Sequence, residues 1–583
     1  MTTQAPTLLS RLDHEPQILQ FGTSGRRGAV VHLTQLEVFI NALAELEYLQ
    51  ALPVAEGGIV RGEEFYFATD LRPSSTRYVP EQQGRGELAQ AVEQAIRAAG
   101  MQPVYLGRIP TPALTCYALS QGKGSMMVTG SHIPFDRNGY KTNTSRGELL
   151  KQHEQPINER VKEVRARLYG EAFDASPFGA DGLFKTGHRD LPPENPIAAD
   201  AYRRRYLAFF GTGALAGMRL VVYQHSAVGR DLVAELLRDL GAAVIEAGRS
   251  ETFVPIDTEN IDAAQLTTIQ ALGDAATAEH GPIDAVVSTD GDSDRQLILG
   301  VDAATGQVRF FGGDMVGMVT AEYLGADAAV VPISCNDAID RGPLKDIVEP
   351  KTRIGSPFVI AGMEAARAQG KRAVCGWEAN GGFLTGSEII RHARALAPLP
   401  TRDAVLPIVA VLVAAREKSL SLIDLFARLP KRYSRAALIK EFPRARSLAI
   451  IARYSPADPA VREAVFADGK ISLLDEGRRE LPASDTERAA VEAIREGLAV
   501  HFDAAEGFGA ITAINYLDGV RTYFGNGDVA HLRPSGNADE LRIYAVAETQ
   551  ARADAIATLA VAEPGGILRR LERELGRDIP PHA

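Results

Sequence analysis

The chain of 583 residues has three cysteines and one tryptophan, and it has no apolar run long enough to cross a bilayer. Cys116, Cys335 and Cys375 are scattered, so they form neither a disulfide framework nor the paired spacing of a zinc site, which favours a reducing compartment. The longest apolar run is AVLPIVAVLVAA, Ala404 to Ala415, whereas a transmembrane helix needs about 20 residues. We expect a buried helix there, in a cytoplasmic protein without a membrane partner.

The N-terminal stretch MTTQAPTLLSRLDHEPQILQ lacks a basic start followed by an apolar core, so we expect no signal peptide. Positive charge is not in excess either, because 63 Lys and Arg stand against 74 Asp and Glu, a formal charge of -11. This balance argues against a general nucleic-acid binder, which needs surplus cations to neutralise phosphates. A small anionic ligand is compatible with it, since the local field of a cleft can oppose the net charge.

A hydrophobic content of 45% over this length is too much for a single core and predicts several domains. The chain has a strand, loop, helix, strand rhythm. EFYFATD (Glu64 to Asp70) is typical of a strand, GELAQAVEQAIRAAG of a helix, and QPVYLG and SMMVTG of further strands. This alternation predicts α/β layers with a largely parallel sheet. The tail from about Arg432 mixes strand-like and helical pieces without βαβ order, which predicts α+β.

Residues 173–196, FDASPFGADGLFKTGHRDLPPENP, are rich in Pro, Gly and Asp and show no hydrophobic periodicity. Such a stretch predicts a long surface excursion or a connection between domains.

The segment DGDSDR, Asp290 to Arg295, carries three carboxylates at alternate positions. In an extended segment, Asp290, Asp292 and Asp294 leave on one face and repel one another unless a cation lies between them. Hard oxygen ligands select Mg²⁺ or Ca²⁺, and the flanking strands suggest a loop at a sheet edge, where α/β proteins place their sites. A solvated acidic turn is the alternative for this short motif alone. An EF-hand is disfavoured, because the motif lies between strands and no bidentate Glu follows it.

The segment TGSHIPFDRNGYK follows a strand of the buried type and places Ser131 beside His132. A serine at the end of a strand acts as a nucleophile if a neighbour activates it, and Lys141 would return to it through the Asn138-Gly139 turn. No G-x-S-x-G elbow is present, which disfavours a hydrolase. Taken alone, this segment favours a structural turn with a capping serine.

Two more loops offer ligand groups. In RPSGNADELRIY, a forked guanidinium and the amides of a glycine-containing turn suit an anion such as phosphate. The residues of this predicted clamp are Arg533, Ser535, Gly536 and Asn537, with Arg542 serving either the clamp or a salt bridge. In GWEANGGF, Glu378 and Asn380 suit vicinal sugar hydroxyls, although an ordinary turn is favoured for this loop alone.

The ordered set of segments resembles the α-D-phosphohexomutase superfamily, and most closely its phosphomannomutase/phosphoglucomutase group. FGTSGRRG at 21–28 is similar to the family's F-G-T-S-G-x-R-G, and ATDLRPSS resembles its D-x-R-x-S-S segment. TGSHIPFDRNGYK resembles the phosphoserine loop T-A-S-H-N-P…N-G-x-K, and DGDSDR matches the metal loop D-G-D-x-D-R. WEANGG and RPSGN resemble the sugar loop and the phosphate loop R-P-S-G-T. Several loop motifs that occur in the family's order are a far more specific signal than any one motif alone. They therefore outweigh the preference for ordinary turns that the single motifs gave.

The resemblance implies an α/β protein with four domains around a central cleft. Domains 1–3 would be three-layer α/β/α units with mixed sheets, and domain 4 would be α+β. We place these domains at residues 1–205 (phosphoserine loop, with the excursion at 173–196), 206–305 (metal loop), 306–431 (sugar loop) and 432–583 (phosphate loop).

The resemblance also implies a mechanism in which Ser131 carries a phosphoryl group. Mg²⁺ would be held by Asp290, Asp292, Asp294 and a phosphoserine oxygen of Ser131. Transfer to a hexose phosphate gives a hexose 1,6-bisphosphate, also the activator, which reorients before the other phosphate returns to the serine. Arg27 and Arg295 are candidates to stabilise the transferring oxygens. His132 and Lys141 are both candidates for proton transfer, and a lysine in that role needs a lowered pKa. The further substrate residues would be Glu378, Asn380, Arg353 and Gly355, with Arg533, Ser535, Gly536, Asn537 and Arg542 on the phosphate.

The expected activity is that of an intramolecular phosphotransferase, an isomerase that interconverts mannose 6-phosphate and mannose 1-phosphate, with glucose phosphates as further substrates. The alternatives are a phosphoglucomutase or an (acetyl)glucosamine-phosphate mutase, which E-A-N-G also resembles. A Mg²⁺-dependent sugar phosphatase and a non-catalytic phosphosugar-binding paralogue are disfavoured by the intact loops. The partners expected are hexose phosphates, for a monomer or a homodimer.

The chain departs from the family pattern in two loops. Gly130 and Ile133 replace the usual Ala and Asn beside Ser131, for which we expect local changes without lost chemistry. Asn537 replaces Thr in the phosphate loop, and Ala538-Asp539 follows in place of Glu-Pro.

Overall fold

The computed structural model describes residues 5–22, 24–259, 261–535 and 539–578. The chain divides into two compact units. Unit 1 comprises residues 1–328 and 356–426, and unit 2 comprises residues 329–355 and 427–583. Both units combine sheets with helices, so the predicted α/β class is confirmed. The division into four domains stays a prediction.

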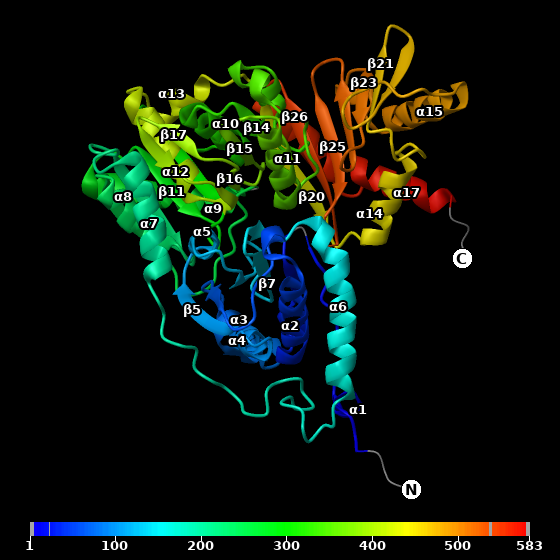
Figure 1. The fold of residues 1–583 in the computed structure, drawn as a ribbon. Helices are drawn as coiled ribbons and strands as arrows, with labels where there is room; N and C mark the ends of the chain where they lie inside the picture. The colour runs from blue at the N-terminus through cyan, green and yellow to red at the C-terminus, as the bar shows by residue number, and fades with distance from the viewer. Residues whose placement is uncertain (1–4, 23, 260, 536–538, 579–583) are drawn as a thin grey trace. The chain divides into compact units, whose positions relative to one another are not determined.

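The first sheet of unit 1 holds the predicted serine loop. Its strand order is β1-β7-β6-β2-β5, with β8 (Gly147–Glu148) paired to β7. The strands are β1 (Arg26–Ala29), β2 (Glu64–Thr69), β5 (Gln102–Arg108), β6 (Ser125–Val128) and β7 (Arg137–Thr144). Helices α2 (Gln35–Ala51), α4 (Leu88–Ala98) and α6 (Lys151–Gly170) pack together beside this sheet (Figure 1). Helix α5 (Thr111–Ser120) contacts β2 and β6 as well. The shorter elements here are α1 (Leu8–Arg11), α3 (Pro73–Thr76), β3 (Tyr78–Val79) and β4 (Arg85–Gly86).

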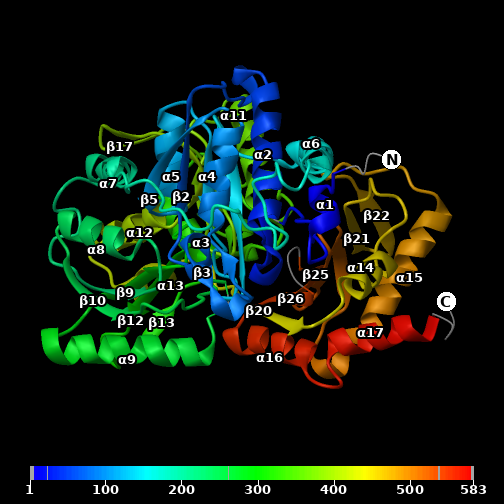
Figure 2. The same cartoon turned by 90° about the horizontal axis from the view of Figure 1, so that it is seen from below.

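The second sheet of unit 1 has the order β10-β9-β11-β12-β13 and holds the acidic loop. Its strands are β9 (Arg219–His225), β10 (Ala243–Arg249), β11 (Ala285–Thr289), β12 (Gln296–Val301) and β13 (Val308–Phe310). Figure 2 shows α9 (Ala263–His280) running along this sheet, which it contacts through β9, β10 and β13. Helices α7 (Ile197–Phe210) and α8 (Arg230–Asp239) also belong to this part of the chain.

The third sheet of unit 1 contains β15 (Val374–Trp377), β16 (Phe383–Thr385) and β19 (Leu399–Asp403). Helix α12 (Val405–Glu417) is buried at every position from Val405 to Ala415, as predicted for the longest apolar run. Among the helices of the described residues, none is both long and apolar enough to cross a membrane. The remaining elements here are α10 (Gly313–Leu324), α11 (Ser356–Ala368), α13 (Leu422–Ala427), β17 (Ile389–Arg391) and β18 (Arg394–Leu396). Strand β14 (Ala328–Val330) begins at the last residue of the first segment of unit 1 and continues into unit 2.

Unit 2 is built on a sheet in the order β20-β26-β25-β24-β23-β21-β22, in which every pairing is antiparallel. The strands are β20 (Tyr433–Lys440), β21 (Glu463–Ala467), β22 (Lys470–Leu474), β23 (Ile511–Asn515), β24 (Val520–Phe524), β25 (Val529–Pro534) and β26 (Glu540–Ala547). The helices are α14 (Arg444–Arg453), α15 (Asp485–His501), α16 (Gln550–Val561) and α17 (Ile567–Asp578). The predicted α+β character of this part is confirmed.

All four predicted functional loops join neighbouring antiparallel strands. The serine loop joins β6 to β7, the acidic loop β11 to β12, the sugar loop β15 to β16, and the phosphate loop β25 to β26. The expectation of a largely parallel sheet is therefore wrong for the first two sheets. Parallel pairing there covers β5-β2-β6 and β10-β9-β11, and the other strands of both sheets pair antiparallel. The chain turns back on itself at each functional loop, and a tight loop can only lead to an antiparallel neighbour.

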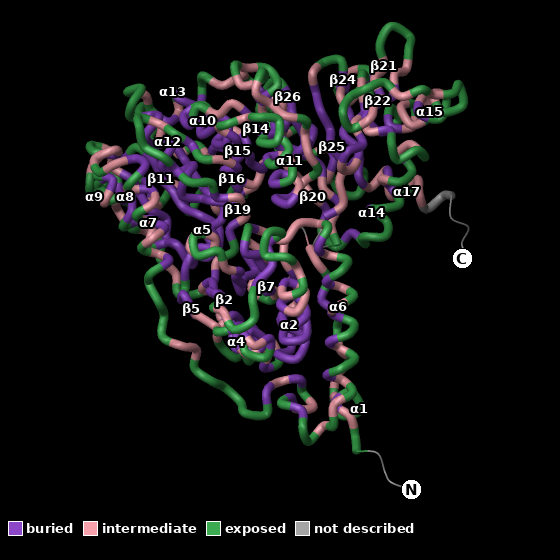
Figure 3. Tube along the Cα trace, in the orientation of Figure 1, coloured by how far each residue is buried: buried purple, intermediate pink, exposed green. Residues whose placement is uncertain are grey.

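The excursion at 173–196 forms no helix or named strand and connects α6 to α7. Most of it is exposed (Figure 3), yet Phe178 is 0% exposed and Phe184 is 8% exposed. The Phe178 ring stacks on that of Phe184 at 4.7 Å and meets the edge of Phe39 in α2 at 5.3 Å. These two aromatic side chains therefore hold an otherwise exposed segment against the hydrophobic core formed by the first sheet and its helices.

Candidate functional site

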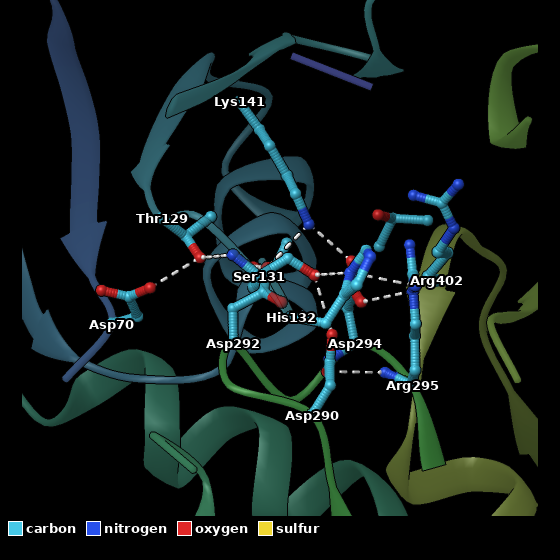
Figure 4. Close-up of polar contacts among 12 residues, drawn as sticks. Asp70, Thr129, Ser131, His132, Lys141, Asp290, Asp292, Asp294, Arg295 and Arg402 are labelled. Carbon is cyan, nitrogen blue, oxygen red and sulfur yellow. Dashed lines mark hydrogen bonds and ion pairs between the residues drawn. The ribbon is translucent and has the colours of Figure 1, made fainter. Parts of the chain in front are cut away.

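Ser131 lies three residues beyond the end of β6 and is fully buried. Its backbone is in the left-handed region, with φ of 55°. Its N–H donates to Thr129 Oγ1 at 2.7 Å, and Thr129 Oγ1 in turn donates to Asp70 Oδ2 at 2.8 Å. The Ser131 hydroxyl donates to Asp290 Oδ2 at 2.8 Å (Figure 4). A strained turn thus points the hydroxyl at the acidic loop of the neighbouring sheet.

Arg72 holds the same turn from the other side, a contact that sequence reasoning missed. Its guanidinium is buried and donates to three carbonyls, at 2.6 Å to Pro134, 2.8 Å to Ile133 and 3.2 Å to Ser131. A Cβ on Gly130 would lie 2.7 Å from Arg72 Cζ. Gly130, where the family usually has alanine, therefore leaves the space that this guanidinium occupies.

The acidic loop is a tight turn, and the expectation of an extended segment is wrong. The Asp290 N–H donates to the Arg295 carbonyl at 3.0 Å, the Ser293 N–H donates to the Asp290 carbonyl at 3.1 Å, and Ser293 has a φ of 58°. The turn nevertheless brings Asp290, Asp292 and Asp294 together, each offering a carboxylate oxygen within 4.8 Å of the others. All three residues are buried.

These carboxylates fit a divalent cation. Asp292 Oδ1 and Asp294 Oδ1 are buried and have no hydrogen-bond partner among the residues described. A buried charged oxygen without a partner is costly, whereas a hard cation supplies one. Asp290 completes the donor set beside the Ser131 hydroxyl. The mutual repulsion of the triad is also visible in the pKa of Asp290, which burial, Asp294 and Asp292 together raise well above its usual range.

Lys141 reaches the triad from β7. Its Nζ lies 2.6 Å from Asp292 Oδ2 and 2.5 Å from Asp294 Oδ2. The predicted turn at Asn138-Gly139 is wrong, because both residues belong to β7, where Asn138 pairs with Gly28 and Gly139 with Arg27 of β1. Burial lowers the pKa of Lys141, but Asp292 and Asp294 outweigh burial and raise it above the usual value. In this arrangement Lys141 is a cation.

His132 contacts both the serine and the acidic loop. Its Nδ1 lies 3.4 Å from Ser131 Oγ and 3.1 Å from Arg295 Nη1. Arg295 can only donate, so Nδ1 is the unprotonated nitrogen of this contact. Arg295 Nε also lies 3.7 Å from Asp294 Oδ1.

Arg27 on β1 belongs to the same charged group. Burial and Arg295 lower its pKa to about 10, against the opposing effect of Asp292 and Asp294. Arg402, at the end of β19, is a further arginine that no motif indicated. It is buried, and its Nε donates to Glu378 Oε2 at 2.5 Å. Burial lowers the pKa of Arg402, but Glu378 and Asp294 raise it above its usual value. Arg402 is therefore paired with the sugar loop and also feels the charge of the acidic loop.

The sugar loop presents one free carboxylate oxygen. Glu378 is buried, and its Oε1 has no hydrogen-bond partner among the described residues. Asn380 uses Oδ1 to accept from the Gly382 N–H at 3.0 Å, and its carbonyl accepts from Thr258 Oγ1 at 2.6 Å. Glu378 Oε1 can therefore accept a hydrogen bond from a ligand hydroxyl. The Asn380 side-chain oxygen is already used within its own turn.

The predicted phosphate-loop residues lie in unit 2, together with Arg353 and Gly355. Arg533 Nε donates to Asp518 Oδ1 at 3.1 Å, and Asp518 Oδ2 accepts from the Ile354 N–H at 2.8 Å. Asp518, which the sequence did not indicate, thus joins the two segments. Arg353 is exposed, and Gly355 has a φ of 129°.

Ser535 is buried, and its N–H donates to the Glu540 carbonyl at 2.9 Å. Arg542 pairs with Glu540 at 2.9 Å, which satisfies the salt-bridge alternative for this residue. Gly536 and Asn537 lie outside the described residues.

Comparison with known proteins identifies the family. The profile of phosphoglucomutase/phosphomannomutase α/β/α domain I matches residues 19–167, and that of α/β/α domain III matches residues 312–433. A phosphomannomutase from Sinorhizobium fredii (strain NBRC 101917 / NGR234) is 34% identical, over 91% of this chain and 95% of that protein. A phosphomannomutase from Salmonella muenchen is 33% identical, over 91% of this chain and 92% of that protein.

A crystal structure of a phosphoglucomutase/phosphomannomutase family protein from Burkholderia thailandensis shares the fold. It has a TM-score of 0.59 and 16% identity, covering 97% of this chain and 99% of that one. The profiles and the relatives of similar length lead to one conclusion: the chain belongs to the phosphoglucomutase/phosphomannomutase family of α-D-phosphohexomutases.

Proposed function

We propose that this protein is a phosphomannomutase that interconverts mannose 6-phosphate and mannose 1-phosphate through phosphorylated Ser131. The observation that carries the proposal is the Ser131 hydroxyl, held 2.8 Å from Asp290 beside three convergent carboxylates. A serine so placed suits a phosphoryl carrier, because its phosphate would lie against a cation site in a protected pocket.

Asp290, Asp292 and Asp294 would hold Mg²⁺, which supplies positive charge to the phosphoryl oxygens during transfer. In the forward step the bond between phosphorus and Ser131 Oγ breaks, and a bond to a sugar hydroxyl oxygen forms. The sugar hydroxyl gives up its proton to a nearby base, and the departing Ser131 Oγ takes up a proton, so that the serine returns as a hydroxyl. We assign the role of base to His132, because the two aspartates keep Lys141 charged. Its unprotonated Nδ1 accepts the proton once Arg295 has turned from it to the transferring oxygens. The negative charge on the transferring phosphoryl oxygens would then be stabilised by the cations Arg27, Arg295 and Lys141.

Glu378 would bind sugar hydroxyls through its free Oε1, with Arg402 fixing its other oxygen. Arg533, Ser535, Arg353 and the turn at Gly355 would bind the phosphate that is not reacting. Binding energy gained at that distant phosphate orients the reacting end. The bisphosphate formed in the first step must reorient before the second phosphate returns to Ser131.

Mannose is favoured over glucose and glucosamine because relatives at 33–34% identity over most of the chain are phosphomannomutases. The test compares kcat/KM for mannose, glucose and glucosamine 1-phosphates with Mg²⁺ and catalytic hexose 1,6-bisphosphate. We expect the highest value for mannose 1-phosphate, and an intact-mass increase of one phosphoryl group at Ser131. A higher value for glucosamine 1-phosphate would reassign the sugar. Steady phosphate release without isomerisation would indicate a phosphatase instead.

A further inference from the structure

The acidic loop is fastened by backbone donors from two helix starts. The Val228 N–H donates to the Gly291 carbonyl at 3.0 Å, and the Gly229 N–H, at the start of α8, donates to Ser293 Oγ at 2.9 Å. The third donor is the N–H of Thr111, the first residue of α5, which reaches the Asp292 carbonyl at 3.0 Å. Helix α5 packs on the first sheet, whereas the loop belongs to the second.

Thr111 also binds the Asp292 side chain. Its hydroxyl donates to Asp292 Oδ2 at 2.6 Å, and both residues are buried, with Thr111 3% exposed and Asp292 0% exposed. The same oxygen accepts from Lys141 at 2.6 Å. Asp292 Oδ1 has no hydrogen-bond partner among the described residues. One oxygen of this carboxylate is therefore committed to the protein, and the other is left for a ligand.

The position of the Thr111 hydroxyl is fixed by its surroundings. Thr111 lies between Pro110 and Pro112, and its carbonyl accepts from Thr115 Oγ1 at 3.0 Å within the helix. A β-branched side chain at a helix start bounded by prolines has few rotamers to choose from. The two contacts with Asp292, one from the backbone and one from the side chain, therefore define both its position and its orientation.

We propose that Thr111 is a positioning residue that keeps Asp292 a one-oxygen ligand and so makes the site select Mg²⁺ over Ca²⁺. Mg²⁺ demands nearly ideal octahedral geometry at short distances, whereas Ca²⁺ accepts longer bonds and bidentate carboxylates. A carboxylate with one oxygen fixed by a hydroxyl cannot turn to offer both. Partners that orient a metal ligand typically change metal affinity by about 10–100-fold when they are removed. This inference rests on the metal site of the proposed function.

The test uses Thr111→Val, which keeps the side-chain shape and removes the hydroxyl, with MgCl₂ and CaCl₂ as probes. Dissociation constants are measured by isothermal titration calorimetry on purified full-length protein, with phosphorylation of Ser131 matched by intact mass. We expect Mg²⁺ binding to weaken by about 10-fold or more and Ca²⁺ binding to change by less than about threefold. Thr111→Ser, which keeps the hydroxyl, restores the wild-type ratio.

The matched control is Thr320→Val, which removes a buried hydroxyl from α10 that donates to the Val316 carbonyl of its own helix at 2.8 Å. It should leave both constants within about twofold of wild type, because outer-shell effects need contact with a ligand. If Thr111→Val does not fold, Thr111→Ala carries the same expectation. An unchanged Mg²⁺ to Ca²⁺ ratio in a folded variant overturns the role of Thr111 and leaves the proposed function standing. A wild-type protein that binds neither ion overturns both.

Discussion

Ser131 and Asp290, 159 residues apart in sequence, meet through a 2.8 Å hydrogen bond between a hydroxyl and a buried carboxylate. One residue comes from the first sheet and the other from the second. The proposed phosphoryl transfer at Ser131 would therefore depend on the packing of two sheets in unit 1.

Replacement of this hydroxyl should abolish turnover. Ser131→Ala is expected to lower kcat by on the order of 10³-fold or more, because a covalent carrier has no substitute in the site. Mutase assays and intact mass would follow activity and phosphorylation. Ser145→Ala is the matched control, since Ser145 is also buried but donates to the Gly58 carbonyl. A Ser131→Ala protein with wild-type turnover would exclude the phosphoserine mechanism.

The Gly130 position should be sensitive to a single methyl group. The added Cβ of Gly130→Ala would meet Arg72 at 2.7 Å, and the guanidinium cannot withdraw without releasing three loop carbonyls. We expect a loss of about 1–3 kcal/mol in unfolding free energy, together with a lower kcat. Thermal unfolding and steady-state assays measure both effects.

Arg72→Lys provides the second arm of a double-mutant cycle. Lysine lacks the two terminal amino groups of the guanidinium and does not hold all three loop carbonyls, so its end can move away from the added methyl group. Gly130→Ala should therefore cost less in that background. Equal costs in both backgrounds would contradict the contact between these residues.

Replacing only one partner of the buried ion pair between Arg402 and Glu378 should lower the stability of the protein. Arg402→Met leaves an uncompensated buried carboxylate and should destabilise unit 1 by about 3–5 kcal/mol. Glu378→Gln removes the charge and should lower kcat/KM by about 10–100-fold through the sugar contact. The double variant should unfold at a higher temperature than Arg402→Met alone. A double variant no more stable than that single variant would contradict the pairing.

Acid should destabilise the protein partly through His225. This residue is fully buried, and burial, opposed by the Thr289 carbonyl, lowers its pKa from 6.5 to about 4. The unfolded chain binds a proton below about pH 6.5 while the folded chain does not, so stability falls as pH drops from about 6.5 to about 4. The full effect is about 3 kcal/mol.

Urea unfolding of unit 1 at pH 7 and pH 4.5 tests this expectation. His225→Gln should show a smaller loss between the two pH values than wild type. His392→Gln is the control, because His392 is largely exposed. The idea fails if His225→Gln retains the full wild-type pH dependence.

The excursion should matter for stability and not for catalysis. Phe178→Ala removes a fully buried ring and should cost about 3–5 kcal/mol. Thermal unfolding would show this loss, while kcat/KM should stay within about twofold of wild type, because no described contact links Phe178 to the site. Asp174→Ala, at an exposed position of the same segment, should change neither quantity. A large kinetic effect of Phe178→Ala would assign the excursion a role in the reaction.

Much of the fold could be predicted because its signals are local. EFYFATD contains β2, the amphipathic stretch after it contains α4, and the apolar run from Ala404 to Ala415 forms most of α12. The acidic triad could also be predicted as a cluster, since its spacing within six residues limits how far apart the carboxylates can be.

The contacts that hold these groups could not be predicted in the same way. Three of the residues that make these contacts belong to no motif, and each forms a hydrogen bond with a residue of a functional loop. They are Thr111, Arg402 and Asp518. The pair Asn138-Gly139 is locally typical of a turn, but its pairing with Gly28 and Arg27 of β1 keeps the segment extended. On the other side, the Thr129 N–H donates to the Gly139 carbonyl at 3.0 Å. Tertiary contacts outweigh local propensity at such positions.

Strand β7 divides two networks between its faces. Lys141 meets Asp292 and Asp294, while the neighbouring Thr142 donates to Glu45 Oε2 at 2.5 Å and Tyr140 donates to Glu45 Oε1 at 3.2 Å. Because successive side chains leave a strand on opposite faces, a slip of one residue would exchange these networks completely. Insertion or deletion of a single residue within β7 ahead of Lys141 would therefore be more damaging than most substitutions there. The register of this strand belongs to the candidate site as much as its side chains do.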